Sequence, residues 1–512
     1  MMNEKWEEQF REQIHEFVGT IEKFDKGEID RKAYKGISGG FGSYAQHDPS
    51  KHMLRLRMTG GNLTEKRLEF LAEAVRDYGV ELMKLTTCET VQLHNLKAEQ
   101  VPVLMEKAIA SEIYSRGGGG DNPRNIMMSP LSGVQKGEAF DVKPYAEAAA
   151  EYLLSIAGEI HMPRKLKVAF SNGADDSVHS AFRDMGFMAN PDGTFTLRIA
   201  GGLGGGYKMG VLVDEHVPAT EILYYIRAMI ETFCQHGNYE NRAKARTRFM
   251  QETLGTDGLK EAFLENVAKV KEKGGLDLHV EAKPVTKKGS GEISGKRVVA
   301  QKQPGLYAVA YHPIGGCLPA GKPAELLTLV REIPDAECRI APHETIYIIN
   351  LTADEAEKVL EVTNDGAKST FENSVACIGA AICQQGVRDS QAALRAAVEA
   401  VREAKIPDGA LPRICISGCP SSCSGHQAAA LGFQGAAKTV DGKPESAFKM
   451  FVGGSDKLGA AKFGEAGAVI LERDLPKFFV DLGKAVASRN MNWETWIAGH
   501  EDEFKAIVEK YA

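Results

Sequence analysis

Several features that would place this chain in a common protein class are missing from its sequence. No uninterrupted apolar stretch reaches about 18 residues, so we expect no transmembrane helix. The opening residues, MMNEKWEEQFREQIHEF, are amphipathic and acidic, so we expect no export signal and a cytoplasmic location. An excess of basic residues is also absent, since the formal net charge is −7, which argues against a general binder of nucleic acid or anionic membranes.

A nucleotide-cofactor motif is missing as well. The glycine run GGLGGG at 201–206 lacks the G-x-G-x-x-G spacing that cradles a dinucleotide. With no convincing nicotinamide or flavin site, any electrons must come from a partner protein. What the chain does have is size: 512 residues, 43% of them apolar, suffice for two or more domains.

An internal duplication organises the chain. The segment 53–63 aligns with the segment around Gly315-Gly316 at an offset of 255 residues, and the same offset aligns CETVQLHNL at 88–96 with HETIYIINL at 343–351. Each copy predicts a strand, a Gly-Gly turn, a helix and a second strand, which together form a β-α-β unit. A helix-rich stretch and a strand with polar residues follow each copy. We therefore expect two similar halves about a pseudo-twofold axis, with one large ligand at their interface.

The cysteines are concentrated in the second half. Five of the nine lie between Cys377 and Cys423, and disulfides are not expected in a reducing cytoplasm. Four of them form the pattern Cys377-x5-Cys383 and Cys419-Pro-Ser-Ser-Cys423. Four thiolates suit a cubane iron–sulfur cluster. Zinc is the main alternative, although zinc knuckles favour gaps of two to four residues. Unligated cysteines, the third possibility, would not need the Gly and Pro residues around them.

These cysteine segments resemble a known family. NSVACIGAAIC and ISGCPSSCSGHQ are similar to the paired signatures, C-x5-C and G-C-P-x-x-C, of the sulfite and nitrite reductase haemoprotein family. The resemblance implies an α+β fold with two ferredoxin-like half-repeats and two sirohaem-binding α/β domains. It also implies that the four cysteines hold a [4Fe–4S] cluster, that Cys423 is shared with the sirohaem iron, and that the electron donor is ferredoxin or a flavoprotein subunit. No separate C-x2-C-x2-C-x3-C run is present, which argues against the dissimilatory type.

Domain boundaries follow from the repeat and the resemblance together. The Lys- and Gly-rich stretch near the middle of the chain predicts a linker between the halves. We expect an N-terminal helical segment at 1–50, a first half-repeat at 51–128, a first haemoprotein domain at 129–275, the linker at 276–300, a second half-repeat at 301–366 and a cluster-bearing haemoprotein domain at 367–512.

A small anionic substrate requires fixed positive charge, and the resemblance implies where it lies. Four residues match the family's substrate-binding positions: Arg55, Arg124, Lys165 and Lys167. Guanidinium groups suit oxyanions, and lysines also pass protons to leaving oxygens. Sulfite reductases of the family carry Lys at the position of Lys167, where nitrite reductases tend to have Asn. We therefore expect six-electron reduction of sulfite to sulfide. Nitrite reduction, a non-catalytic iron–sulfur electron carrier and a zinc-stabilised structural protein are the alternatives.

The sirohaem contacts are also implied by the resemblance. The positions that match the family are Arg57, Lys84, Gln92, His94, Arg164, Cys423 and the amides of Gly201, Gly202 and Leu203. Two positions depart from the family, which usually has Arg at Cys88 and Asn at Ser421. Cys88 is either a reactive thiol or a small packing residue. The cysteines outside these sets, which we expect to be structural, are Cys234, Cys317, Cys338 and Cys415.

Overall fold

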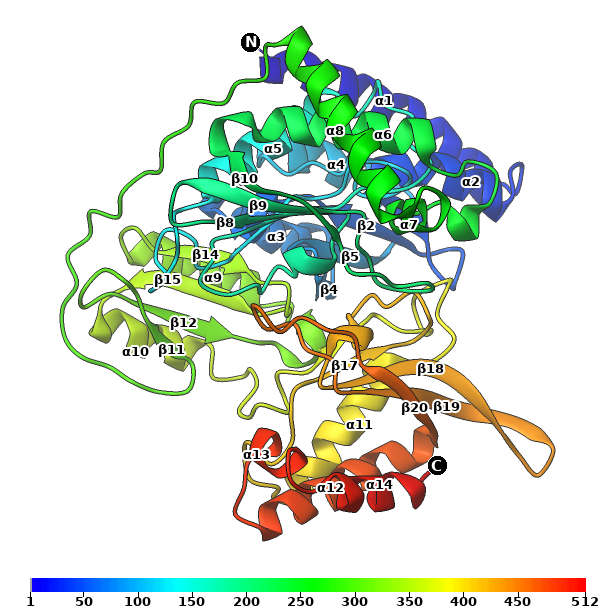
Figure 1. The fold of residues 1–512 in the computed structure, drawn as a ribbon, viewed down its shortest axis with the longest axis vertical. Helices are drawn as coiled ribbons and strands as arrows, with labels where there is room; N and C mark the ends of the chain where they lie inside the picture. Colours follow the sequence, from blue (N-terminus) through cyan, green and yellow to red (C-terminus); the bar gives the residue numbers. More distant parts are fainter. Residues whose placement is uncertain (1) are drawn as a thin grey trace.

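The computed structural model describes residues 2–512, in which it places fourteen α-helices and four five-stranded sheets. Figure 1 shows the first half of the chain above the second, with the N-terminal helices α1 (Met2–Asp25) and α2 (Arg31–Ser38) at the top. Phe10, Ile14 and Phe17 of α1 are buried in the core that both half-repeats share. No helix in this part of the chain combines the length and apolar character needed to cross a membrane.

Each ferredoxin-like half-repeat contributes an antiparallel sheet that also contains one strand of the other half. The first sheet comprises β1 (Ser43–Ala45), β2 (His52–Leu56), β5 (Val91–Leu96), β4 (Leu82–Leu85) and β13 (Cys317–Leu318). The second comprises β11 (Val298–Ala300), β12 (Tyr307–Tyr311), β15 (Ile346–Leu351), β14 (Glu337–Ile340) and β3 (Asn62–Leu63). The helices on these sheets are α3 (Glu65–Tyr78), α4 (Gln100–Ala110), α9 (Lys322–Glu332) and α10 (Ala353–Val362). This reciprocal exchange of β3 and β13 joins the two halves through backbone hydrogen bonds.

The two α/β domains repeat a second topology, in which three parallel strands are continued by two antiparallel ones. The first sheet contains β6 (Met127–Met128), β7 (Val168–Ser171), β8 (Met185–Ala189), β9 (Thr194–Ile199) and β10 (Val211–Pro218). The second contains β16 (Val375–Ala376), β17 (Ile414–Ser417), β18 (Leu431–Val440), β19 (Lys443–Val452) and β20 (Glu465–Leu471). The helices of the first domain are α5 (Lys143–Ser155), α6 (Ile222–His236), α7 (Met250–Thr253) and α8 (Gly255–Lys273). Those of the second are α11 (Ser390–Glu403), α12 (Leu475–Ser488), α13 (Trp493–Ile497) and α14 (Glu501–Glu509).

The same pair of glutamine–asparagine hydrogen bonds occurs in both halves and confirms the duplication. The Gln46 side chain donates to Asn95 Oδ1 at 2.8 Å and accepts from the Asn95 backbone N–H at 2.9 Å. At the same offset of 255 residues, Gln301 makes both contacts with Asn350, at 3.1 and 2.7 Å. Both asparagines have a positive φ, 59° and 63°, which Asn tolerates better than most residues. The predicted duplicated α+β fold is therefore correct.

One local prediction was wrong: the expected β-α-β unit has an additional strand. The residues read as one second strand form the hairpin β4–β5, which is broken at Thr86–Thr90. Glu89 has a φ of 56° in this turn, and its buried carboxyl group accepts a 3.0 Å hydrogen bond from the Met128 N–H. The turn is thereby anchored to β6 of the neighbouring domain, a long-range contact that the apolar periodicity of the segment does not encode.

The stretch between the halves runs along the outside of the molecule. Residues 274–297 contain no helix or strand in the described structure and form the long green connection at the left of Figure 1. Lys287 holds this segment to the second half through an ion pair of 2.7 Å with Glu355.

A buried ion pair joins the two halves at the exchanged strands. Lys84 of β4 pairs with Glu344 of the second half, and each side chain is only 3% exposed. Lys84→Met should lower the free energy of unfolding by about 3–5 kcal/mol, because the Glu344 carboxylate is then buried without a partner. Urea denaturation followed by circular dichroism measures this change.

Lys66→Met is the matched control, since Lys66 forms a 3.0 Å ion pair with Glu112 in which both side chains are more than half exposed. We expect this control to cost about 0–1 kcal/mol. Equal and small shifts for both variants would contradict a stabilising role for the buried pair.

Candidate functional site

A cavity between the two halves brings together residues that are far apart in the sequence. Lys165 and Lys167, which directly precede β7, form one side of it. The opposite side is the loop Ser421–Gly425 that follows β17 in the second half. Gly202 and Leu203 also line this cavity. Residues of both halves therefore meet at this cavity.

The four predicted cluster cysteines converge at one edge of this cavity. Desolvation raises the pKa of the Cys423 thiol to about 12, and the charges of Cys377, Cys383 and Cys419 act in the same direction. Backbone amides already point at two of the sulfurs: Gly418 donates to Cys377 Sγ at 3.1 Å and Gln385 to Cys383 Sγ at 3.4 Å. Amide hydrogen bonds of this kind stabilise thiolate ligands and tune a cluster's potential.

The described cysteine sulfurs are not gathered as tightly as the ligands of a single zinc ion. A tetrahedral zinc ion with Zn–S bonds of about 2.3 Å holds its sulfurs roughly 3.8 Å apart. Within residues 2–512, no three cysteine sulfurs lie within 4.8 Å of one another. The wider arrangement suits a cubane cluster, whose four irons hold the four thiolates further apart.

Small residues allow the cysteine loops to approach one another closely. A Cβ on Gly418 would collide with the Arg388 carbonyl oxygen, so only glycine fits beside Cys419. Gly379, between Cys377 and Cys383, has a φ of 78°, and a Cβ there would lie 2.7 Å from Asp389 Oδ1. The glycines noted in the sequence are therefore required by the geometry of the cysteine loops.

The two predicted substrate arginines also lie together. Arg55 Nη1 and Arg124 Nη1 both donate to the Gly118 carbonyl oxygen, at 2.7 and 2.8 Å. Burial, with Arg55 nearby, lowers the pKa of Arg124 to about 10. The charge of Arg124 in turn contributes to the lowered pKa of Lys165. Of the four predicted anion-binding residues, Lys165 and Lys167 line the cavity, whereas Arg55 and Arg124 lie outside its lining.

Burial dominates the electrostatics of the lysines. It lowers the pKa of Lys165 well below its usual value, and Arg246, Lys167 and Arg124 lower it further. Burial also lowers the pKa of Lys167, whose ammonium group lies beside the Cys88 thiol. Several cations concentrated in a desolvated cavity create a strong site for an anion.

The predicted sirohaem contacts divide into two groups. Gly202, Leu203 and Cys423 line the cavity. The others engage protein groups: Arg57 donates to the Arg116 and Arg124 carbonyls, Lys84 pairs with Glu344, and Arg164 contacts Asp121 at 3.3 Å. Gln92, with its amide oriented to satisfy both partners, accepts from Arg55 Nε at 2.8 Å, and burial lowers the pKa of the neighbouring His94 to about 3. Gly201 donates to the Arg183 carbonyl.

Sequence reasoning missed three basic residues that line the cavity: His179, Arg183 and Arg246. Arg246 lies in the basic run RAKARTR at 242–248, a signal that could have drawn attention to it. Its Nη2 donates to the Asp184 carboxylate at 2.9 Å. His179 and Arg183 stand in the loop between β7 and β8, where no motif marks them. Of the two departures from the family, Ser421 lines the cavity, and Cys88 contacts Lys167.

Comparison with known proteins supports the family resemblance seen in the sequence motifs. A family model described as the nitrite and sulphite reductase 4Fe-4S domain matches residues 119–271, and one described as the nitrite/sulfite reductase ferredoxin-like half domain matches residues 44–111. The chain is 28% identical over 455 residues to the chloroplastic ferredoxin–nitrite reductase of Arabidopsis thaliana, covering 85% of this chain and 75% of that one. It is 27% identical over 485 residues to the ferredoxin–nitrite reductase of Synechococcus elongatus, with 91% of both chains covered.

A solved structure shares the fold. The structure of the Mycobacterium tuberculosis NirA protein superposes with a TM-score of 0.78 at 23% identity, and the match covers 94% of this chain and 92% of that one. Four converging thiols and a cationic cavity between duplicated halves define an iron–sulfur oxidoreductase that acts on a small anion. Both family models and the named relatives support the resemblance of this chain to the sulfite and nitrite reductase haemoprotein family.

The residues present fit the cofactors of this family, sirohaem and a [4Fe–4S] cluster. The four cysteines, two of whose sulfurs already accept backbone amide hydrogen bonds, would provide the ligands of the cluster. Beside them, the cavity offers Gly202, Leu203 and a concentration of positive charge, which suits a macrocycle that carries eight carboxylates. The loop Ser421–Gly425, which carries Cys423, forms part of the lining of this cavity.

Proposed function

We propose that the chain reduces nitrite to ammonia with six electrons taken from ferredoxin. The observation that carries this proposal is that Lys165 and Lys167 of one half and Cys423 of the other line a single cavity. The named relatives support nitrite rather than sulfite as the substrate, and ferredoxin as the electron donor. The expectation of sulfite reduction thus becomes the second candidate.

Different residues of the chain bind the anion and supply protons in this reaction. When bound, sirohaem and the [4Fe–4S] cluster would supply electrons to the anion one at a time. Arg55 and Arg124 bind and orient its oxygens, because their guanidinium groups make paired hydrogen bonds to oxyanions. Lys165 and Lys167 neutralise the anion and donate protons to its leaving oxygens. Nitrite, six electrons and eight protons give one ammonium ion and two waters, so this proton supply is essential.

Steady-state assays of the holoenzyme with reduced ferredoxin test this proposal. Nitrite should be consumed with formation of stoichiometric ammonium and six oxidised ferredoxins per turnover, and sulfite should be reduced more slowly. Rapid sulfide formation with slow nitrite turnover would make sulfite the substrate. A protein that reduces neither anion would overturn both candidates.

Lys167 carries the remaining argument for sulfite, because the family's nitrite reductases tend to have Asn at its position. Lys167→Asn should lower the sulfite rate about tenfold while the nitrite rate changes by less than about threefold, because sulfite has more oxygens to protonate and remove. The ratio of the two values of kcat/KM is the measurement. Lys136→Asn, at an exposed lysine, is the matched control. An unchanged ratio would remove the argument from Lys167 for sulfite.

A further inference from the structure

Arg183 is a buried arginine in the cavity wall that has no carboxylate at ion-pair distance among the described residues. Only 6% of the Arg183 surface is exposed, and the side-chain Nε donates a 2.8 Å hydrogen bond to the Val178 carbonyl oxygen. Nη2 lies 3.5 Å from the Thr87 carbonyl and 3.4 Å from His179 Nδ1. Throughout residues 2–512, no carboxylate lies within 4.0 Å of this guanidinium, and Nη1 has no hydrogen-bond acceptor.

The nearby acidic groups do not neutralise this charge. Burial raises the pKa of the nearby Glu89 well above its usual value, which weakens its charge pairing with Arg183. Asp184 accepts hydrogen bonds from Arg246 and Thr247 instead. Arg183 Nη1 is a charged donor that faces no acceptor of the protein, which favours an anionic acceptor in the cavity. We infer that Arg183 binds an anionic oxygen of the ligand that occupies the cavity, and that His179 and Asp456 hold its side chain in place.

The duplicated halves provide an independent indication that Arg183 serves this site. The strands β8 and β18 correspond at an offset of 246 residues, since they pair in the same register with β7 and β17. The counterpart of Arg183 is therefore Ala429. The architecture that both halves share does not require an arginine at this position. We therefore attribute the charge of Arg183 to a role in the cavity that it lines.

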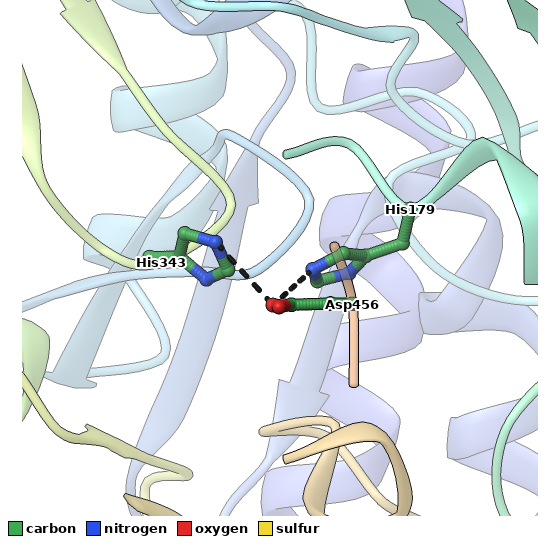
Figure 2. Close-up of side chains that lie close together, drawn as sticks. All are labelled: His179, His343 and Asp456. Atoms are coloured by element: carbon green, nitrogen blue, oxygen red, sulfur yellow. Dashed lines mark hydrogen bonds and ion pairs between the residues drawn. The ribbon is translucent and has the colours of Figure 1, made fainter. Parts of the chain in front are cut away.

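A series of polar contacts, which runs through His179 to Asp456, holds the Arg183 side chain in position. Figure 2 shows His179 and His343 on either side of the Asp456 carboxylate. His179 Nε2 lies 3.2 Å from Asp456 Oδ2, and His343 Nε2 lies 3.6 Å from the same oxygen. Arg413 Nη2 contacts this oxygen at 3.0 Å. The carboxylate therefore fixes the His179 ring, whose other nitrogen faces Arg183.

The same cluster has the composition of a metal site, but its hydrogen bonds favour a positioning role. His179, His343 and Asp456 offer three ligand atoms within 4.8 Å of one another. Because Arg183 donates toward His179 Nδ1, that nitrogen is the unprotonated one, and Nε2 carries the proton that Asp456 accepts. A protonated Nε2 cannot bind a metal, and Arg413 already supplies the positive charge that Asp456 needs.

The position of Arg183 also accounts for an anomaly in the sequence. The family usually has an arginine where this chain has Cys88, and the loss of that cation left the seating of the macrocycle in question. The charge of Arg183 reaches this place: together with Lys167 it lowers the pKa of Cys88 to about 6, although burial alone would raise it. A guanidinium from the β7–β8 loop thus replaces one from the β4–β5 turn. This inference rests on the proposed function, because it takes the ligand to be an anion.

The test compares Arg183→Gln with Arg183→Lys in the purified holoenzyme. The first removes the charge, and the second keeps it but loses the guanidinium fork. If Arg183 binds a macrocycle carboxylate, the ratio of haem absorbance to protein absorbance should fall at least threefold in Arg183→Gln and be partly restored in Arg183→Lys. If it binds the substrate, the haem content should be unchanged and the optical Kd for nitrite should rise about tenfold, again with partial rescue.

The positioning residues and controls complete the experiment. His179→Gln and Asp456→Asn should each produce about a threefold change in the same quantity that Arg183→Gln alters. Arg76→Gln, at an exposed arginine bound to Asp77, should change neither quantity. Circular dichroism identifies any variant that has not folded, and Arg183→Lys then decides the result.

Normal haem content and normal nitrite affinity in folded Arg183→Gln would overturn the inference while leaving the proposed function intact. A stoichiometric zinc ion that is lost in His343→Gln would assign the cluster to metal binding and overturn the positioning role. A wild-type protein without haem would instead contradict the proposed function itself, so the two failures are distinguishable.

Discussion

Cys423→Ser is expected to change the cluster and haem spectra together and to reduce nitrite turnover more than a thousandfold. Cys423 is the cysteine that opens to the cavity shared with Lys165 and Lys167, and its charge is coupled to Cys377, Cys383 and Cys419. A hydroxyl group is a far weaker ligand than a thiolate for iron–sulfur clusters. Visible absorption and electron paramagnetic resonance spectra of the purified variant measure both cofactors in one sample.

Cys234→Ser provides the matched control, because Cys234 lies on α6 and donates to the His161 carbonyl, away from the other thiols. We expect it to retain both spectra and nearly full activity. If Cys423→Ser lost only its cluster and kept an unaltered haem spectrum, the two cofactors would not share this residue, even with the cluster itself established.

Lys165→Met is expected to lower kcat/KM for nitrite by about 10²–10³-fold with little change in haem or iron content. The ammonium group is buried among Arg246, Lys167 and Arg124, where each charge acts through little solvent. Methionine has a similar volume but neither charge nor proton, so the loss measures electrostatic stabilisation and proton donation together. Steady-state kinetics with reduced ferredoxin and an optical titration with nitrite separate turnover from binding.

Lys136→Met is a suitable control, since Lys136 is exposed outside the cavity. A loss of less than about threefold in Lys165→Met would remove Lys165 from the proton supply. A normal kcat accompanied by a large rise in Kd would restrict it to binding.

Much of the fold could be predicted because the duplication is evident from short sequence motifs that recur in both halves. The repeated ETxxxxNL motif corresponds to structural constraints. Glu89 anchors a turn through its hydrogen bond to the Met128 N–H. Asn95 has a positive φ, and a glutamine side chain hydrogen-bonds to the asparagine of the motif in both halves. The cysteine motifs were equally informative, because glycines such as Gly418 tolerate no side chain. Residues whose role is set by local geometry are thus visible in a single sequence.

Other features could not be predicted because they arise from long-range packing. The exchange of β3 and β13 between the half-repeats depends on the association of the halves. Lys84 was expected at the macrocycle, but Glu344, distant in sequence, pairs with it. Arg183 and His179 carry no motif, and only the folded chain brings them to the cavity.

The visible absorption spectrum of the purified protein, recorded with iron and acid-labile sulfide analysis, tests the coupled cofactor site most directly. We predict haem bands that shift on addition of nitrite, with about five irons and four sulfides per chain for one sirohaem and one [4Fe–4S] cluster. A colourless protein that contains zinc and no acid-labile sulfide would contradict the assignment of these four cysteines and of the cavity beside them.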